Sequence, residues 1–317
     1  MVRGRFAPSP TGELHLGNLR TALLAWLQVR AAGGRFVMRV EDLDRGRVRQ
    51  GMMEAQLADL RWLGLEWDEG PDVGGGFAPY LQSQRQERYA AALQRLAGEG
   101  LLYECFCSRR DIAAASSAPH GPAEEGPCYP GSCDALSADA LAQRAGSAAA
   151  LRMRVSPGEV CFDDLLFGPV CFTPAEETGD FVVRRKDGIA AYQLAVVVDD
   201  AAMEITHVLR GADLLSSTAR QLLLYDALDL PPPEWLHVPL LLGPDGERLS
   251  KRHGAVTLRE VREAGLPPEA VVGWLAASCG LAEPGEELTA AELIPRFSPA
   301  RLAREATIFP GALHPPG

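Results

Sequence analysis

The residues best suited to chemistry lie near the amino terminus, where a proline-rich turn precedes a histidine, a glycine and an asparagine. The apolar spacing that follows predicts a helix starting directly after the turn. The start of a helix presents unpaired N–H groups and the positive end of the helix dipole, so it suits a phosphate group. His15 could add a hydrogen-bond donor, and Gly17 leaves the backbone open to a ligand. The stretch reads Arg5-Phe6-Ala7-Pro8-Ser9-Pro10-Thr11-Gly12, followed after two residues by His15-Leu16-Gly17-Asn18.

A second candidate is the loop 243–252, which contains a Gly-Pro-Asp-Gly turn and three cations, Arg248, Lys251 and Arg252. Lys251 could cover the β- and γ-phosphates of a nucleotide and neutralise charge as pyrophosphate leaves. Taken alone, such a loop is more often a solvated surface segment, and a lone His-x-Gly pair is more often an ordinary helix end.

Two predicted strands lead into charged side chains. The strand 35–40 is followed by an acidic cluster at 41–44 that contains Glu41, and the strand 205–211 carries Arg210 near its carboxyl end. In a parallel α/β sheet the ligand crevice lies outside these strand ends. The carboxylates could hold a substrate ammonium group, although acidic residues after a strand are also common helix N-caps.

Four of the seven cysteines lie in residues 104–150, a segment with few large apolar side chains. Two pairs of ligands separated by a loop predict a structural zinc site, in which the metal replaces a missing core. Because thiolates are softer and more readily deprotonated than a phenol, chemistry alone favours four thiolates. Four unrelated reduced cysteines are the alternative. The candidate ligands are Cys105, Cys107, Cys128 and Cys133.

These side chains need a scaffold that brings distant segments together. The first strand, helix and strand form a β–α–β unit, and the later order of elements is typical of an α/β protein. Residues 189–200 form an uninterrupted apolar run, whose periodicity does not separate strand from helix. Cys161 and Cys171 alternate with apolar residues and are expected in the core. We predict helices at 52–63, 84–96, 217–228, 258–263 and 268–278, and strands at 151–155, 160–162, 169–172, 181–185 and 236–242.

The composition is ordinary for a globular protein of 317 residues, with 23% charged and 47% hydrophobic residues. No apolar run of membrane-spanning length and no signal-peptide layout is present, so we expect a cytoplasmic protein without membrane contact. A net charge of −11 argues against indiscriminate nucleic-acid binding but allows a local basic patch. The absence of GxGxxG and Walker A patterns removes the main support for dinucleotide and P-loop sites.

The amino-terminal stretch resembles the HIGH signature of class I aminoacyl-tRNA synthetases, in the glutamate branch, where RFAPSPTG precedes it. Asn18 stands in the place of the second histidine, and an amide can donate a hydrogen bond but cannot carry a proton charge. The loop at 248–252 resembles the second signature, KMSKS. Segments 41–44, 192–200 and 208–214 resemble the glutamyl-tRNA synthetase core, so the similarity covers about residues 3–280.

The short layout, without room for an anticodon-binding domain, resembles the truncated branch of this family, the glutamyl-queuosine tRNA(Asp) synthetases. This resemblance implies ATP-dependent and tRNA-independent activation of glutamate, followed by transfer to queuosine at the wobble position of tRNA(Asp). It also implies Mg²⁺ with ATP and a structural Zn²⁺. The zinc pattern of that branch, C-x-C then Y-x₃-C, names Cys105, Cys107, Tyr129 and Cys133 as ligands, and Cys128 remains the alternative to Tyr129.

Residue-by-residue transfer implies a glutamate pocket with two arginines and one carboxylate, which matches the charges of the ligand. An arginine fork would bind a carboxylate in two places and reject the amide of glutamine. Glu41 would pair with the ammonium group, and the Tyr192 hydroxyl would fix the orientation. The implied pocket comprises Arg5, Phe6, Ala7, Pro8, Ser9, Glu41, Tyr192 and Arg210; His15, Gly17, Asn18 and Lys251 would bind ATP, with His15, Asn18 and Lys251 catalytic.

The resemblance implies an α/β fold with a Rossmann-like parallel sheet, an inserted zinc-containing α+β subdomain and a short C-terminal helical region. The expected boundaries are 1–103 with 188–242 for the catalytic domain, 104–187 for the insertion and 243–317 for the rest, in a monomer. Rival interpretations are a truncated glutamyl-tRNA synthetase, a catalytically silent tRNA-binding paralogue suggested by Asn18 and Arg248, and a small nucleotidyltransferase. The last gives no reason for Arg210 and Tyr192 to occur together.

Overall fold

The computed structural model describes residues 1–108, 110–112, 128–247, 249 and 257–311. Its main sheet has six strands in the order β2-β1-β8-β9-β5-β6. Every neighbouring pair is parallel except β5 and β6, which form an antiparallel hairpin at one edge. The predicted α/β fold built on a parallel sheet is therefore confirmed. The strands are β1 (Arg3–Phe6), β2 (Arg35–Met38), β5 (Val160–Asp164), β6 (Gly168–Phe172), β8 (His207–Gly211) and β9 (Glu234–Val238).

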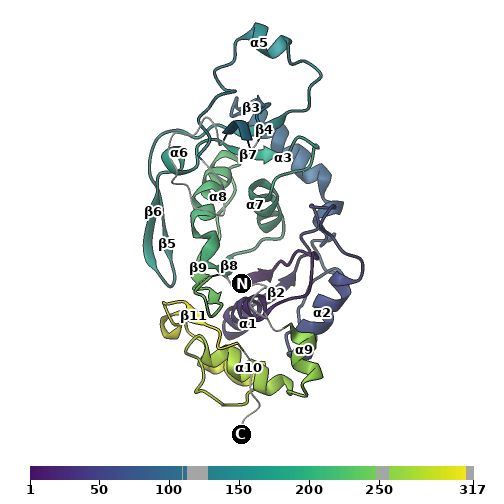
Figure 1. Ribbon diagram of the computed structural model, residues 1–317, viewed down its shortest axis with the longest axis vertical. Coiled ribbons are helices and arrows are strands. Elements are labelled where there is room, and N and C mark those ends of the chain that lie inside the picture. Colours follow the sequence, from purple (N-terminus) through teal and green to yellow (C-terminus); the bar gives the residue numbers. More distant parts are fainter. Residues whose placement is uncertain (109, 113–127, 248, 250–256, 312–317) are drawn as a thin grey trace.

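Both faces of the central strands are covered, as the near-continuous apolar runs of a parallel sheet require. Phe36 and Leu209 pack with α1 in one core, whereas Val37 and Val208 belong to a second core with α7. Figure 1 shows the same division, with α1 and α10 below the sheet and α7 and α8 above it. The helices of the first core are α1 (Leu16–Ala31), α2 (Met52–Trp62), α9 (Leu258–Glu263), α10 (Pro268–Ala277) and α11 (Ala290–Leu293); those of the second are α3 (Gln86–Gly98), α7 (Tyr192–Ala202) and α8 (Leu215–Ala227).

The apolar run that periodicity left open is a helix, α7. Every residue from Gln193 to Asp200 in it is buried, because α7 packs against α3, α8 and β7. A helix enclosed on all sides loses the polar face that gives a helical period its signal.

The inserted segment contributes to two sheets. Its β3 (Leu102–Cys105), β4 (Ala150–Met153) and β7 (Phe181–Arg184) form a separate antiparallel sheet near α5 (Ala138–Ala142) and α6 (Pro174–Glu177), at the upper end of Figure 1. Its hairpin of β5 and β6 instead extends the main sheet, because Asp164 pairs with Trp235 of β9. The insertion therefore reaches into the main sheet, while the domain boundaries given above remain a prediction.

Cys161 and Cys171 are not core residues, contrary to the expectation. They face each other across the β5–β6 hairpin, are joined by a disulfide and are exposed. The alternation along these strands is real, but the face of the hairpin that carries the cysteines is the exposed one. The partly buried side chains of the hairpin are Phe162, Val170 and Phe172, and the two cysteines lie on the opposite, solvent-exposed face.

The helices α10 and α11 of the carboxyl-terminal part pack against α1. There β10 (Leu241–Leu242) pairs in parallel with β11 (Thr307–Ile308). Short 3₁₀ turns span Gln82–Gln84, Ala212–Leu214, Ile294–Arg296 and Pro299–Arg301. Among the described residues, no helix is both long and apolar enough to cross a membrane.

Candidate active site

A cavity of about 170 Å³ lies at the carboxyl ends of β1 and β8 and opens beside a larger cleft of about 1030 Å³. All but one of the side chains predicted to bind glutamate or ATP line one of these two spaces. Pro8 and Ser9 line only the outer cleft. Lys251 falls outside the described residues, as does Arg248. The inner cavity is lined by Arg5, Phe6, Ala7, His15, Gly17, Asn18, Glu41, Tyr192 and Arg210, among others.

His15 is the N-cap of α1. Its Nδ1 accepts hydrogen bonds from the N–H groups of Gly17 and Asn18, at 3.1 and 3.3 Å, and the Asn18 side chain accepts one from the His15 N–H. The expectation that these N–H groups are open to phosphate therefore needs correction, because the imidazole occupies two of them. Since Nδ1 accepts, the neutral ring carries its proton on Nε2.

The two ends of the undescribed stretch that contains Lys251 both lie beside the cavity. On one side, the Leu249 N–H donates to the carbonyl of Leu241, a cavity-lining residue. On the other side, Thr257 forms an isolated antiparallel bridge with His15. The described residues Leu249 and Thr257 therefore both contact residues that line the cavity, while Lys251 lies outside the described residues.

Arg5 points its Nε edge at a buried carboxylate. Nε lies 3.2 Å from Asp200 Oδ1, and Nη2 lies 3.3 Å from Asp200 Oδ2. Burial alone would raise the pKa of Asp200, but the guanidinium groups of Arg39 and Arg5 hold it below its ordinary value. Asp200 is therefore charged and fixes Arg5, whose Nη1 group has no hydrogen-bond partner among the residues that the structure describes.

Arg39 joins Asp200 to Glu41. Its Nη1 lies 2.5 Å from Asp200 Oδ1, and its Nη2 donates to Glu41 Oε1 at 3.1 Å. Burial raises the pKa of Glu41, although Arg39 and Arg5 oppose that shift. The Glu41 carboxylate in the cavity wall is thus held in place by the fully buried guanidinium group of Arg39.

Arg210 is buried and held by four described partners. Its Nε donates to His237 Nε2 at 3.0 Å, and its Nη2 donates to Thr218 Oγ1 at 2.8 Å and to the Leu214 carbonyl at 3.2 Å. Its Nη1 donates to Gln221 Oε1 at 2.8 Å. These bonds use up to four of the five N–H donors. The predicted two-point fork from Arg210 is therefore reduced to one remaining N–H, on Nη1, plus the positive charge.

Sequence reasoning missed the groups that hold the two arginines, and a third arginine. Arg20, one turn after His15, lines the same cavity, is buried and donates to the Pro239 carbonyl. Asp200 and His237 are the holding groups. Charged or polar residues inside apolar runs were the available signal, because such a residue is buried only with a partner.

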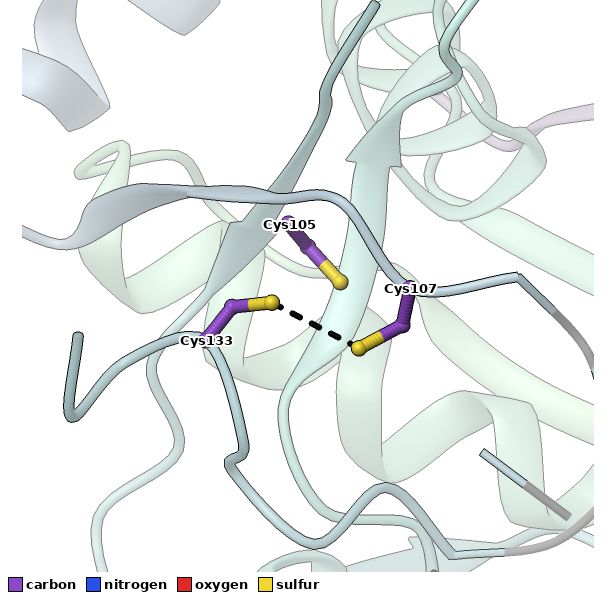
Figure 2. A group of neighbouring side chains, drawn as sticks. All are labelled: Cys105, Cys107 and Cys133. Carbon is purple, nitrogen blue, oxygen red and sulfur yellow. Dashed lines mark hydrogen bonds between the residues drawn. The ribbon is translucent and has the colours of Figure 1, made fainter. Parts of the chain in front are cut away.

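The cysteine cluster gathers three thiols from the insertion. The Sγ atoms of Cys105, Cys107 and Cys133 lie within 4.8 Å of one another (Figure 2). The Tyr129 hydroxyl lies 3.5 Å from Cys105 Sγ, whereas Cys128 Sγ points to the backbone carbonyl of Tyr129. A structural zinc takes four sulfur, nitrogen or oxygen donors in a tetrahedron, and three thiols with one phenol oxygen supply four such donors. The geometry favours Tyr129 over Cys128 as the fourth donor.

Known proteins resemble the chain over almost its full length. The family model described as tRNA synthetases class I (E and Q), catalytic domain, matches residues 1–309. The Glutamyl-Q tRNA(Asp) synthetase of Symbiobacterium thermophilum is 57% identical over 98% of this chain and 96% of its own, and that of Nocardia farcinica is 52% identical over 96% and 92%. A solved glutamate tRNA ligase from Elizabethkingia meningosepticum, in complex with its amino acid, gives a TM-score of 0.84 at 29% identity and covers 98% of this chain and 67% of that one.

Proposed function

The chain belongs to the class I (E and Q) tRNA synthetases, a family of ligases, and on this premise we propose that it activates glutamate with ATP in the absence of tRNA and transfers it to queuosine at the wobble position of tRNA(Asp). The relatives named Glutamyl-Q tRNA(Asp) synthetase support the choice of substrates. The first substrates are glutamate and ATP, and the second is a tRNA(Asp) that carries queuosine.

The observation that carries the proposal is the charge arrangement of the inner cavity. Arg5 and Arg210 supply two cations, and Glu41 supplies an anion in the same space. Glutamate brings two carboxylates and one ammonium group, so each charge finds a partner. Glutamine would lose one of these ion pairs, and burial makes such a loss costly. Tyr192 lines both the cavity and the cleft, and its hydroxyl would orient the bound amino acid.

In the first step an oxygen of the α-carboxylate attacks the α-phosphorus of ATP. One P–O bond forms to give glutamyl-adenylate, and the bond to pyrophosphate breaks. His15 Nε2 and the Asn18 amide would donate to phosphate oxygens, with Lys251 neutralising the leaving group. The protein contributes positioning and charge stabilisation more than covalent chemistry. Mg²⁺ bound with ATP would supply further charge neutralisation.

In the second step a hydroxyl of the queuosine ring attacks the adenylate carbonyl, and AMP leaves. The cleft of about 1030 Å³ has room for the nucleoside and shares His15, Glu41 and Tyr192 with the inner cavity. We propose that the protein works as a monomer in the cytoplasm, where both ATP and tRNA are present. A structural Zn²⁺ held by Cys105, Cys107, Tyr129 and Cys133 belongs to the same proposal.

The activation step can be tested by exchange of labelled pyrophosphate into ATP without tRNA. We expect exchange that depends on glutamate and is at least about tenfold slower with glutamine, because an unpaired buried charge costs more than about 1.4 kcal/mol. Absence of exchange with any amino acid, in protein shown to be folded, would instead support a catalytically silent tRNA-binding protein.

A further inference from the structure

The second glutamate-binding arginine is oriented by a histidine that does not line the cavity. Arg210 and His237 are direct neighbours on the parallel strands β8 and β9. His237 is fully buried, and its Nε2 lies 3.0 Å from Arg210 Nε. Arg210 Cζ also lies 4.7 Å from the ring centre of Trp235, so the guanidinium is held from its face as well as from its edge.

The protonation state of His237 follows from its partners. A guanidinium has only donors, so His237 Nε2 must accept from Arg210 and cannot carry a proton. The proton therefore sits on Nδ1, which lies 2.7 Å from Asp164 Oδ2 and donates to it. The Thr218 hydroxyl, 3.2 Å from Nε2, can donate to the same nitrogen while it accepts from Arg210. One neutral tautomer satisfies every contact.

Asp164 anchors this chain of hydrogen bonds in the hairpin of the insertion. Its Oδ1 accepts from the N–H groups of Leu166 and Phe167 at 2.9 and 3.0 Å, which closes the turn between β5 and β6. Its Oδ2 accepts from both the backbone N–H and Nδ1 of His237. All four contacts are buried or nearly so, and the Asp164 side chain is 0% exposed.

We propose that His237 is a positioning residue for amino-acid binding: through its Nε2 it holds Arg210 so that the remaining Nη1 donor faces the cavity, and Asp164 fixes the ring for that task. This inference rests on the proposed function, since it gives Arg210 a glutamate carboxylate to bind. Without the acceptor, the Arg210 Nε–H would be buried and unpaired, and the guanidinium would turn toward another partner.

Two substitutions separate this role from a merely structural one. In His237→Gln the amide carbonyl can replace Nε2 as the acceptor for Arg210. In His237→Asn the amide N–H can replace Nδ1 as the donor to Asp164, but nothing reaches Arg210. A buried core variant that lines neither the cavity nor the cleft, Val271→Ala in α10, serves as a control for lost stability alone.

We expect His237→Asn to raise the KM for glutamate about tenfold or more, with the KM for ATP changed less than about threefold. His237→Gln should stay within about threefold of the wild type for both substrates, and Val271→Ala should lower the melting temperature without changing either KM. If the asparagine variant keeps the wild-type KM for glutamate, or if the glutamine variant loses as much as the asparagine variant, the proposal is wrong.

A measurement on the unmodified protein covers the case in which a variant fails to fold. Nitrogen NMR of the His237 ring should show Nδ1 protonated and Nε2 unprotonated at neutral pH, and a protonated Nε2 would overturn the proposal. The two proposals can fail separately. If the proposed function is wrong, the wild type shows no glutamate-dependent exchange, while the ring tautomer of His237 is still the one expected.

Discussion

At the scale of single residues, the charged groups of the cavity depend on partners far away in the sequence. Asp200 holds Arg5 and Arg39, although 195 and 161 residues separate these partners. The sequence could predict Arg5, Glu41 and Arg210 because they stand at strand ends and match family motifs. It could not predict which buried group each one contacts, because strand order decides those pairs.

The pH dependence of stability should report the neutral state of His237. Burial lowers its pKa to about 4, with the positive charge of Arg210 acting in the same direction and Asp164 opposing. Between pH 6.5 and about 4 the unfolded chain binds a proton at this residue and the folded chain does not. Folding stability should therefore fall as the pH is lowered through this range, by up to about 3 kcal/mol from this residue.

The measurement is urea unfolding at a series of pH values, with His237→Gln as the control because glutamine does not titrate. The stability difference between wild type and variant should shrink as the pH falls from 7 toward 4. A difference that stays constant across this range would show that the ring does not titrate as its burial requires.

At the scale of elements, the order of helices and strands was largely predictable from periodicity and turn residues. The exceptions have physical causes. The run that became α7 is enclosed on all sides and so shows no period, and the hairpin β5–β6 has its apolar side chains on the face opposite to the one expected. The sequence predicts His15 at a helix start, but only the side-chain hydrogen bonds show that it is the N-cap of α1.

The cysteine cluster gives a prediction at the element scale, because a metal there would join the segment of Cys105 and Cys107 to the segment of Cys133. Tyr129 lies beneath the guanidinium of Arg152, whose Cζ is 3.7 Å from the ring centre. Burial and the hydrogen bond with Cys105 raise the pKa of Tyr129, so a metal ion would have to displace the phenol proton. We expect about one zinc per chain in the wild type and in Cys128→Ser, and a loss of zinc in Cys105→Ser. Tyr129→Phe, which keeps the ring under Arg152, should bind zinc more weakly.

Elemental analysis after extensive dialysis, together with competition against a chelator, provides the readout. If the folded wild-type protein binds no zinc even when zinc is supplied, the prediction of a zinc site is wrong. If Cys128→Ser loses zinc and Tyr129→Phe retains it, the assignment of the fourth ligand is reversed.

At the scale of the whole molecule, one sheet connects the inner cavity to the inserted segment. The inner cavity lies at the ends of β1 and β8, and the hairpin of the insertion joins the same sheet through β9 (Figure 1). Family motifs in the sequence predicted the parallel sheet and the insertion. They did not predict that part of the insertion would extend that sheet, because one residue pair, Asp164 of β5 with Trp235 of β9, makes the junction.

The most direct test of the proposed function is transfer of labelled glutamate to purified tRNA(Asp) with and without queuosine at the wobble position. Label should appear only on the queuosine-containing tRNA, should require ATP, and should remain after the 3′ end of the tRNA has been removed. Label at the 3′ end of tRNA(Glu), or equal labelling of tRNA(Asp) lacking queuosine, would contradict the account and identify a truncated glutamyl-tRNA synthetase instead.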